Sequence, residues 1–308
     1  MTLLPRLLAA AMIALPLPAC AQEAPTSAAT PAAQAGSTRS DADPALWVVR
    51  DKDTTLYLFG TIHMLQPGMT WFDEAVKTAF DRSGELMFEI VQGDPAQQQQ
   101  LMVAKGMNPA GPTLTEQLPA DKRDAVGKAL VEAGLPKPAY DRMDPWLAAL
   151  IASLTPIQKL GYKGENGPET VLAAAAKASG KPVSALETTE QQIGFFDGLS
   201  RPAQVQFLVS TVDELPKAGE TMAKMVALWS AGNPDGLAAE MNESLKDSPE
   251  VAKTLLTDRN ARWATLLKAR MAKPGTVFVA VGAGHLAGAG SVQAQLARAG
   301  VKVERVRY

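Results

Sequence analysis

Four short runs of apolar residues stand out along the chain, and each leads into a histidine or a glutamate. Their continuous apolar character is typical of strands that are buried on both faces of a sheet. The first and last runs lead into the same pattern, a glycine followed by two further residues and a histidine. The four runs and the residues that they lead into are Thr55–Phe59 with His63, Glu85–Phe88 with Glu89, Lys181–Leu186 with Glu187, and Thr276–Val281 with His285.

Helical periodicity alternates with these strands and predicts an α/β fold. We expect a central sheet, mainly parallel or mixed, with a last strand near the end of the chain. Two longer stretches carry only helix-like periodicity broken by Pro and Gly, which predicts helical insertions that form a cap. The predicted helices are Asp73–Asp81, Glu169–Ser179 and Gln293–Ala299, the last strand is Val301–Val306, and the insertions are Asp94–Leu160 and Pro202–Lys273.

Residues 1–21 predict an export signal. The sparse positive charge of Arg6 precedes an apolar stretch, Leu7–Leu17, that is too short to span a bilayer. Two maturation routes fit: cleavage after Ala21 by an ordinary signal peptidase, or a lipoprotein route that makes Cys20 an acylated lipid anchor. The intact mass of the mature protein distinguishes them. Either route predicts a periplasmic or otherwise extracytoplasmic protein, and the second an outer-membrane lipoprotein.

Composition predicts one globular domain behind a tether. Residues 22–44 are rich in Ala, Pro, Ser, Thr and Gln without an apolar period, which predicts a flexible linker, and residues 45–308 form the domain. The chain is 46% hydrophobic and 20% charged, with a formal net charge of −2, as in ordinary soluble proteins. Because it has no run of Lys and Arg, we expect no nucleic-acid partner. Cys20 is the only cysteine, so an apolar core and not a disulfide must stabilise the domain.

Functional side chains of α/β sheets gather beyond the carboxyl ends of the strands, and four candidates follow strands here. They are His63, Glu89, Glu187 and His285. Imidazoles and carboxylates are suitable ligands for a divalent metal ion such as Mn, Co, Zn or Fe. A single histidine in a turn is more often structural, and an acid after a strand often caps the next helix. The shared context of both histidines of the chain favours a common function.

A glycine-rich turn offers a rival interpretation. Gly282, Gly284 and Gly288 follow a strand and precede a helix, with Glu304 further on, as in a dinucleotide-binding unit. The third glycine comes one residue late and a histidine occupies the turn, so nucleotide binding is the weaker alternative. Nucleophilic triads are disfavoured, because the chain has no G-x-S-x-G motif and no cysteine besides Cys20.

Several motifs in a fixed order cover nearly the whole domain. They are Trp47, Leu56–His63, Phe88–Glu89, Ala185–Thr188 with Gln191 or Gln192, Arg259–Asn260 and Val279–Gly288. Over residues 46–308 the chain thereby resembles the TraB/GumN family, which includes the Tiki proteases. The resemblance implies an α/β fold related to the erythromycin esterase and ChaN group. It also implies a metal-dependent peptidase activity, which in Tiki is carried by the residues that match His63, Glu89 and His285.

Two further positions gain meaning from this resemblance. Arg259 lies on an amphipathic helix, where a surface salt bridge would be its ordinary role, but the resemblance places it at the site. A guanidinium there would hold a carboxylate or a developing oxyanion. The segment Gly167-Pro168-Glu169 departs from the glycine, apolar residue and aspartate of the family. Its longer acid either caps the following helix or changes the geometry of the site.

Three functions fit these patterns. The first is an exported, metal-dependent hydrolase, peptidase-like, that acts on a peptide or another small substrate. His63 and His285 would bind the ion, Glu89 would be a ligand or the general base, and Arg259 and Glu187 would complete the catalytic residues. The alternative is a metal-free, esterase-like hydrolase in which a histidine activates water. The third is an envelope protein that binds a peptide or glycan without turning it over.

Overall fold

A computed structural model describes residues 40–245 and 248–308 of the chain. The predicted export signal, the anchor at Cys20 and the predicted linker up to residue 39 lie outside the described residues. Within the described residues, no helix combines the length and the apolar character needed to cross a lipid bilayer.

A six-stranded mixed sheet forms the centre of the protein, in the order β6-β5-β7-β3-β2-β8. The four strands from β6 to β3 run parallel to one another, whereas β2 is antiparallel to both of its neighbours. This arrangement confirms the predicted α/β fold with a mixed sheet. The strands are β2 (Leu46–Arg50), β3 (Thr54–Thr61), β5 (Glu85–Phe88), β6 (Val183–Ala185), β7 (Gly275–Gly282) and β8 (Val303–Arg305), while β1 (Ser40–Asp41) and β4 (Met69–Thr70) pair separately.

The strand boundaries differ from the prediction mainly at the edges of the sheet. β3 and β7, in the middle, are each eight residues long and extend beyond the predicted runs. β6 has only three residues, because it is an edge strand with one neighbour, and its Val183 is 40% exposed. The pattern did not predict β2, which pairs with β3 through a short turn. Asp51 fixes that turn by accepting the backbone N–H groups of Asp53 and Thr54.

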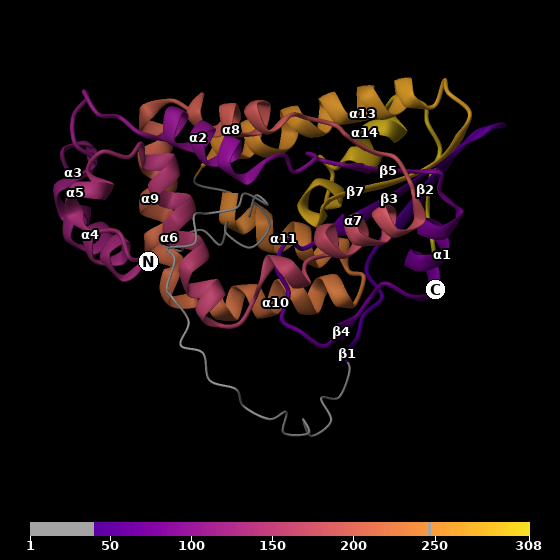
Figure 1. The fold of residues 1–308 in the computed structure, drawn as a ribbon, viewed down its shortest axis with the longest axis horizontal. Coiled ribbons are helices and arrows are strands. Elements are labelled where there is room, and N and C mark those ends of the chain that lie inside the picture. The colour runs from indigo at the N-terminus through magenta and orange to yellow at the C-terminus, as the bar shows by residue number, and fades with distance from the viewer. Residues whose placement is uncertain (1–39, 246–247) are drawn as a thin grey trace.

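Helices cover both faces of the sheet (Figure 1). One face packs against α13 and α14 through a buried cluster that includes Trp263 and Leu296. The other face packs against α1, α7 and α10, with Leu172 and Trp229 in the interface. The helices of these two layers are α1 (Glu74–Arg82), α7 (Pro168–Ser179), α10 (Ala218–Ser230), α13 (Asp258–Arg270) and α14 (Val292–Arg298).

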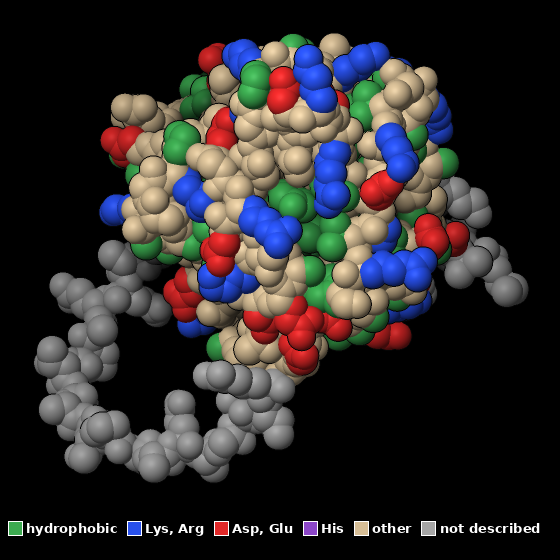
Figure 2. Space-filling view, turned by 90° about the vertical axis from the view of Figure 1, so that its right-hand side faces the viewer, with side chains coloured by type: hydrophobic (Ala, Val, Ile, Leu, Met, Phe, Trp, Pro, Cys, Tyr) green, Lys and Arg blue, Asp and Glu red, His purple; other side chains and the backbone are tan. Residues whose placement is uncertain are grey.

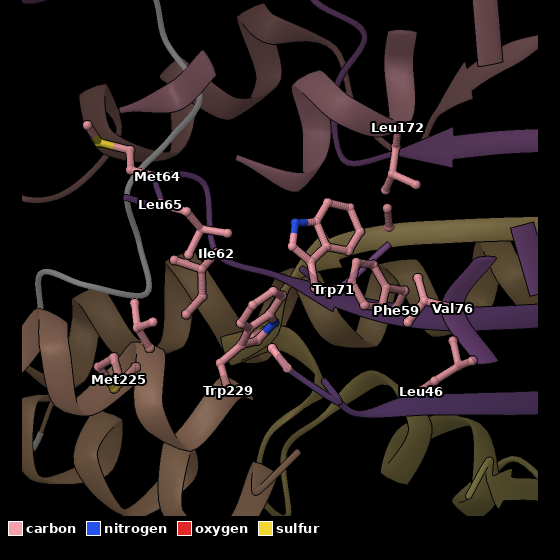
Figure 3. Close-up of a cluster of buried hydrophobic side chains, with 14 of the residues drawn as sticks. Leu46, Phe59, Ile62, Met64, Leu65, Trp71, Val76, Leu172, Met225 and Trp229 are labelled. Atoms are coloured by element: carbon pink, nitrogen blue, oxygen red, sulfur yellow. The ribbon is translucent and has the colours of Figure 1, made fainter. Parts of the chain in front are cut away.

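Aromatic side chains join the sheet to this second layer near the carboxyl end of β3 (Figure 3). Phe59 stacks on Trp71 with ring centroids 5.5 Å apart, and Trp229 meets Trp71 edge-on at 6.3 Å. The indole N–H of Trp229 donates to the carbonyl oxygen of Gly60 at 2.7 Å. Helix α10 is therefore attached directly to the glycine that opens the first G-x-x-H turn.

The two predicted insertions are helical, and much of their apolar surface is buried in a second core beside the sheet (Figure 1, left). At the centre of this core lies α6, whose Trp146 is fully buried and packs against Phe196 of α8. The remaining helices are α2 (Pro95–Gly106), α3 (Leu114–Gln117), α4 (Arg123–Glu132), α5 (Lys137–Tyr140), α6 (Pro145–Lys159), α8 (Thr189–Asp197), α9 (Arg201–Glu214), α11 (Pro234–Leu245) and α12 (Pro249–Ala252).

The face of the molecule opposite these cap helices carries mixed charge. Figure 2 shows Lys and Arg side chains interspersed with Asp and Glu around a small apolar area, with acidic side chains gathered at one edge. Such a surface is not the continuous basic patch that nucleic acid requires. The expectation that nucleic acid is not a partner stays a prediction.

Candidate functional site

The parallel strands bring the four predicted residues to one edge of the sheet. His63 and His285 follow the two central strands, β3 and β7, and Glu89 and Glu187 follow β5 and β6. Because these strands are parallel, all four residues lie beyond the same, carboxyl ends. The site therefore forms between the sheet and the helices of the cap.

The glycines that open the two G-x-x-H turns allow close packing. A Cβ atom on Gly60 would lie 3.0 Å from Cα of Ala283, so the two turns touch backbone to backbone. A Cβ atom on Gly282 would lie 3.1 Å from Oε1 of Glu89 and 3.5 Å from Nε2 of His63. Neither glycine has a positive φ, so the space and not the backbone conformation requires glycine here.

His63 is oriented by a carboxylate that the strand pattern did not predict as part of the site. Its Nδ1 lies 2.6 Å from Oε1 of Glu169, and the Thr61 hydroxyl donates to the same oxygen at 2.5 Å. Since a carboxylate only accepts, Nδ1 carries the proton and Nε2 keeps its lone pair. Burial favours the neutral ring, but the charge of Glu169 and its hydrogen bond outweigh burial and raise the pKa of His63 above its ordinary value.

Glu169 reaches His63 because α7 begins against the first G-x-x-H turn. A Cβ atom on Gly167 would overlap the carbonyl oxygen of His63, so only glycine allows this approach. Pro168 then occupies the first helical position, where its missing N–H costs no hydrogen bond. The departure from the family pattern at this segment thus places a longer acid in contact with the histidine.

Arg259 uses all five of its N–H groups inside the protein. Its Nε donates to Glu187, with distances of 3.3 and 3.1 Å to the two oxygens. Its Nη2 donates to Oε2 of Glu187 at 2.9 Å and to Oε2 of Glu89 at 2.8 Å. Its Nη1 lies 3.2 Å from the Leu255 carbonyl oxygen and 3.2 Å from Nε2 of His285. A developing oxyanion could receive a hydrogen bond from this guanidinium only if one of these partners were released.

Glu187 lies behind Arg259, with a fully buried side chain. Besides Arg259, it accepts from Nε1 of Trp263 at 2.9 Å and from Arg262. These donors occupy both of its oxygens, so Glu187 acts on the site through the position of Arg259. Its predicted catalytic role is therefore that of a positioning residue.

His285 is held as a neutral ring. Its Nδ1 lies 2.6 Å from Oδ1 of Asn260, whose amide nitrogen donates to the carbonyl oxygen of Gly290 at 2.9 Å. This second bond identifies the Asn260 oxygen as the acceptor, so Nδ1 of His285 is the donor and Nε2 accepts from Arg259. Burial and the charge of Arg259 lower the pKa of His285 to about 3. The ring also packs on Trp263, with centroids 4.3 Å apart.

Glu89 stands between the two histidines as a carboxylate. Its Oε1 accepts the backbone N–H of Gly282 at 2.7 Å, and its Oε2 accepts from Arg259 at 2.8 Å and from Nε2 of Gln192 at 3.0 Å. Burial opposes the charged form, but the charge of Arg259, the two neighbouring imidazoles and the Gly282 N–H outweigh burial and lower the pKa of Glu89 to about 2. It is therefore an acceptor, and not a proton donor, at neutral pH.

A cavity of about 310 Å³ opens in front of these groups. His63, Glu89 and Glu169 line its inner end, together with Gln192. The Nε2 atom of His63 has no hydrogen-bond partner among the described residues. The one ring nitrogen of the site that is free to act on a ligand therefore belongs to His63.

The predicted donors of a metal ion converge, but Arg259 already contacts two of them. A Cβ atom on Gly282 would lie 3.1 Å from Oε1 of Glu89 and 3.7 Å from Cδ2 of His285, so these two side chains face the same small space. The same two residues bind Arg259, with His285 offering its only lone pair to Nη1. No group of three His, Cys, Asp or Glu side chains in the described part of the chain is arranged to hold one ion. The arrangement does not fit an ion held by both histidines, and that ligand set stays a prediction.

The dinucleotide interpretation of the second glycine-rich turn is not supported by the fold. In such a unit the helix opens directly after the first glycines, so that its N-terminus faces the pyrophosphate. Here the residues after Gly282 form a short buried turn, and α14 begins only at Val292 with Ser291 as its N-cap. The strand that follows, β8, is antiparallel to its neighbour β2.

The lowered pKa values of His285 and Glu89 predict that acid destabilises the fold. Below pH 6.5, the ordinary pKa of histidine, the unfolded chain protonates His285 but the folded protein does not until its pKa of about 3. Glu89 adds to this loss between 4.5 and about 2. The pKa of His63 is raised, so the stability that His63 contributes is fully present below pH 6.5 and does not change with pH there. The free energy of unfolding should fall by about 3 kcal/mol between pH 6.5 and about pH 4 from His285 alone.

Urea unfolding at a series of pH values, followed by tryptophan fluorescence, measures this slope. His285→Gln is the matched variant, because its amide offers one donor and one acceptor but does not titrate. The variant should lose most of the slope between pH 6.5 and about pH 4. Equal slopes in both proteins would contradict the assignment of the loss to His285.

One family model covers all the residues that build the site. The model of the TraB/PrgY/gumN family matches residues 45–305. Proteins from Escherichia coli (strain K12) and Shigella flexneri, both named uncharacterized protein YbaP, are each 29% identical over 193 residues, which is 61% of this chain and 69% of theirs. No solved structure matches the chain with statistical significance.

Proposed function

This chain belongs to the TraB/PrgY/gumN family, and we propose that it is a hydrolase of carboxylic esters or amides, peptides included. Family membership alone assigns no reaction, since the relatives named above are uncharacterized. The observation that carries the proposal is the state of His63. Its Nδ1 is bound by Glu169, its Nε2 is free of protein partners among the described residues, and it lines a cavity. A carboxylate that orients an imidazole in this way is typical of general-base catalysis.

Glu89 supplies the second contact that an attacking water needs. Its Oε1 and Nε2 of His63 lie 3.1 and 3.5 Å from the position that a Cβ atom on Gly282 would take, so the two acceptors face one small space. In the proposed mechanism one water molecule beside that position donates to both atoms. With both hydrogens fixed, a lone pair of its oxygen is directed toward the cavity. The low pKa of Glu89, about 2, keeps it an acceptor throughout.

His63 alone carries out both proton transfers of the reaction. The water oxygen bonds to the carbonyl carbon of the substrate while Nε2 of His63 takes one of its protons. The tetrahedral intermediate collapses as the bond to the leaving oxygen or nitrogen breaks, and Nε2 returns the proton to that atom. Between the two steps the imidazolium is stabilised by Glu169, which is also what raises the pKa of His63. Arg259 holds Glu89 and keeps His285 neutral, and it performs no proton transfer.

A metal-dependent reaction remains the second candidate, because His63, Glu89 and His285 surround one small region. An ion bound by all three would need Arg259 to release His285 and to share Glu89. The general-base proposal needs no such movement, and for that reason we prefer it.

Chelation separates these two candidates. If His63 is the general base and no ion takes part, hydrolysis of a p-nitrophenyl ester should survive dialysis against EDTA. The metal content of the purified protein, measured by mass spectrometry, should also be the same in His63→Ala and His285→Ala as in the unaltered protein. Activity that disappears with EDTA and returns with Mn or Co would overturn the metal-free mechanism and favour the metal-dependent one.

The setting of the reaction is also part of the proposal. Export to the periplasm, with or without an anchor at Cys20, rests on the N-terminal residues, which lie outside the described part of the chain. A binding protein without turnover is the outcome if none of the tested esters or amides is hydrolysed.

A further inference from the structure

The cavity in front of His63 changes character along its length. The buried polar groups of the site form one part of its lining, whereas the rest is mainly aliphatic or aromatic carbon, with Gln92 and Thr170 as the polar exceptions. Phe88 of β5 and Ala280 of β7 form part of the sheet side, and Ala173 of α7 lies on the helix side. Val91 and Val183 border it, and they are 46% and 40% exposed. A concave lining that is mainly apolar, with a few polar groups, is typical of a small-molecule site.

The charges at the inner end are all matched within the protein. Glu169 is paired with His63 at 2.6 Å, and Glu89 with Arg259 at 2.8 Å. A charged group that entered the cavity would lose water and gain no free counter-charge from the described lining, which is costly. An uncharged aliphatic group would lose no strong interaction with water, and it would cover carbon that is otherwise exposed.

We infer that this cavity is a specificity subsite for an uncharged aliphatic group attached to the carbonyl that His63 and Glu89 address. The inference rests on the proposed hydrolase function for its orientation, with the carbonyl at the polar end. The volume of about 310 Å³ is in the range of small-molecule pockets, so it accommodates a chain of several carbons. A fatty acyl chain and an aliphatic amino-acid side chain share this chemistry.

Two pairs of p-nitrophenyl esters test the subsite and distinguish these sources. Hexanoate against acetate reports on an acyl chain, and N-acetylleucine against N-acetylglycine reports on a side chain. Each buried methylene adds about three- to fourfold in affinity, so burial of even two of the added carbons should raise kcat/KM of the longer member over that of the shorter by about tenfold or more. The pair with the larger ratio identifies the source, and either ratio supports the subsite.

Variants of α7 provide the matched control. Ala173→Trp should fill the cavity and bring both ratios close to one, while Ala174→Trp, at an exposed neighbouring position outside the cavity lining, should leave them unchanged. If Ala173→Trp does not fold, Val183→Ser at the mouth replaces it and should reduce the ratios severalfold. Ratios near one in the unaltered protein, or unchanged in a folded variant of either kind, would overturn the subsite.

Binding without turnover separates this inference from the proposed function. Hexanamide should bind the unaltered protein and His63→Ala, measured by ligand-observed NMR, more tightly than acetamide does. If hexanamide binds but no ester is hydrolysed, the subsite stands and the hydrolase proposal fails. If esters are hydrolysed but hexanamide binds no better than acetamide, the hydrolase stands and the subsite fails.

Discussion

Replacing His63 by alanine is expected to lower kcat/KM for ester hydrolysis by about 10²- to 10⁴-fold, the usual contribution of a general base. His63 is the residue of the site whose free nitrogen lines the cavity, whereas Nε2 of His285 is occupied by Arg259. Steady-state kinetics with the ester that the unaltered protein hydrolyses fastest measures the change. Added imidazole should restore part of the activity, which a purely structural role would not allow.

The pH profile gives an independent check on the same residue. A general base must be unprotonated, so the rate should rise with pH and level off above the raised pKa of His63. In Glu169→Gln the main cause of that raised pKa is lost, and the rising limb should move to lower pH with a smaller maximal rate. An unshifted limb in a folded Glu169→Gln protein, or full activity in His63→Ala, would remove His63 from the mechanism.

Replacing Arg259 by alanine is expected to reduce the free energy of unfolding by about 3 to 5 kcal/mol, the usual result of breaking a buried ion pair. Arg259 is 5% exposed and is the shared partner of Glu89 and Glu187, so its removal leaves Glu89 without its guanidinium partner and Glu187 with only the half-exposed Arg262. Arg259→Lys should also lose several kcal/mol, since an ammonium has three donors where the site uses five.

Arg262 is the matched control for this experiment. It contacts the same carboxylate of Glu187, but its side chain is 40% exposed. Arg262→Ala should therefore cost no more than about 1 kcal/mol. Urea unfolding of the three variants at neutral pH measures the differences. A loss in Arg259→Ala no larger than that in Arg262→Ala would show that the buried network does not stabilise the fold.

The sequence predicted the edge of the sheet at which the site forms, because four parallel strands were recognisable. β3, β5 and β7 are continuous apolar runs, so the residues after them could be placed at one edge. β2 escaped prediction because it follows directly on the region that was interpreted as a linker. β6 was predicted too long. It is an edge strand that pairs on one side only, and the apolar pattern alone does not show where that pairing ends.

The hydrogen-bond partners of the predicted site residues were harder to predict from the sequence. Glu169 comes from the start of a helix, 106 residues after His63, and no periodicity connects the two. Its only signal was the unusual Gly167-Pro168-Glu169 segment, whose glycine proves to be required by contact with His63. Arg259 was expected from the family resemblance, yet the partners of its five N–H groups depend on side-chain positions that no sequence pattern specifies. Because all five N–H groups of Arg259 are occupied, the proposed mechanism relies on His63 and not on Arg259.

The central pair of strands also determines the order in which the protein can be completed. β3 pairs with β7 from Thr54 with Gly275 to Thr61 with Gly282, so the middle of the sheet joins segments from opposite ends of the domain. During synthesis the N-terminal part of the chain emerges first. The edge of β3 that pairs with β7 therefore stays unpaired until nearly the whole domain has been made. Such long-range pairing makes folding slow and exposes strand edges to aggregation.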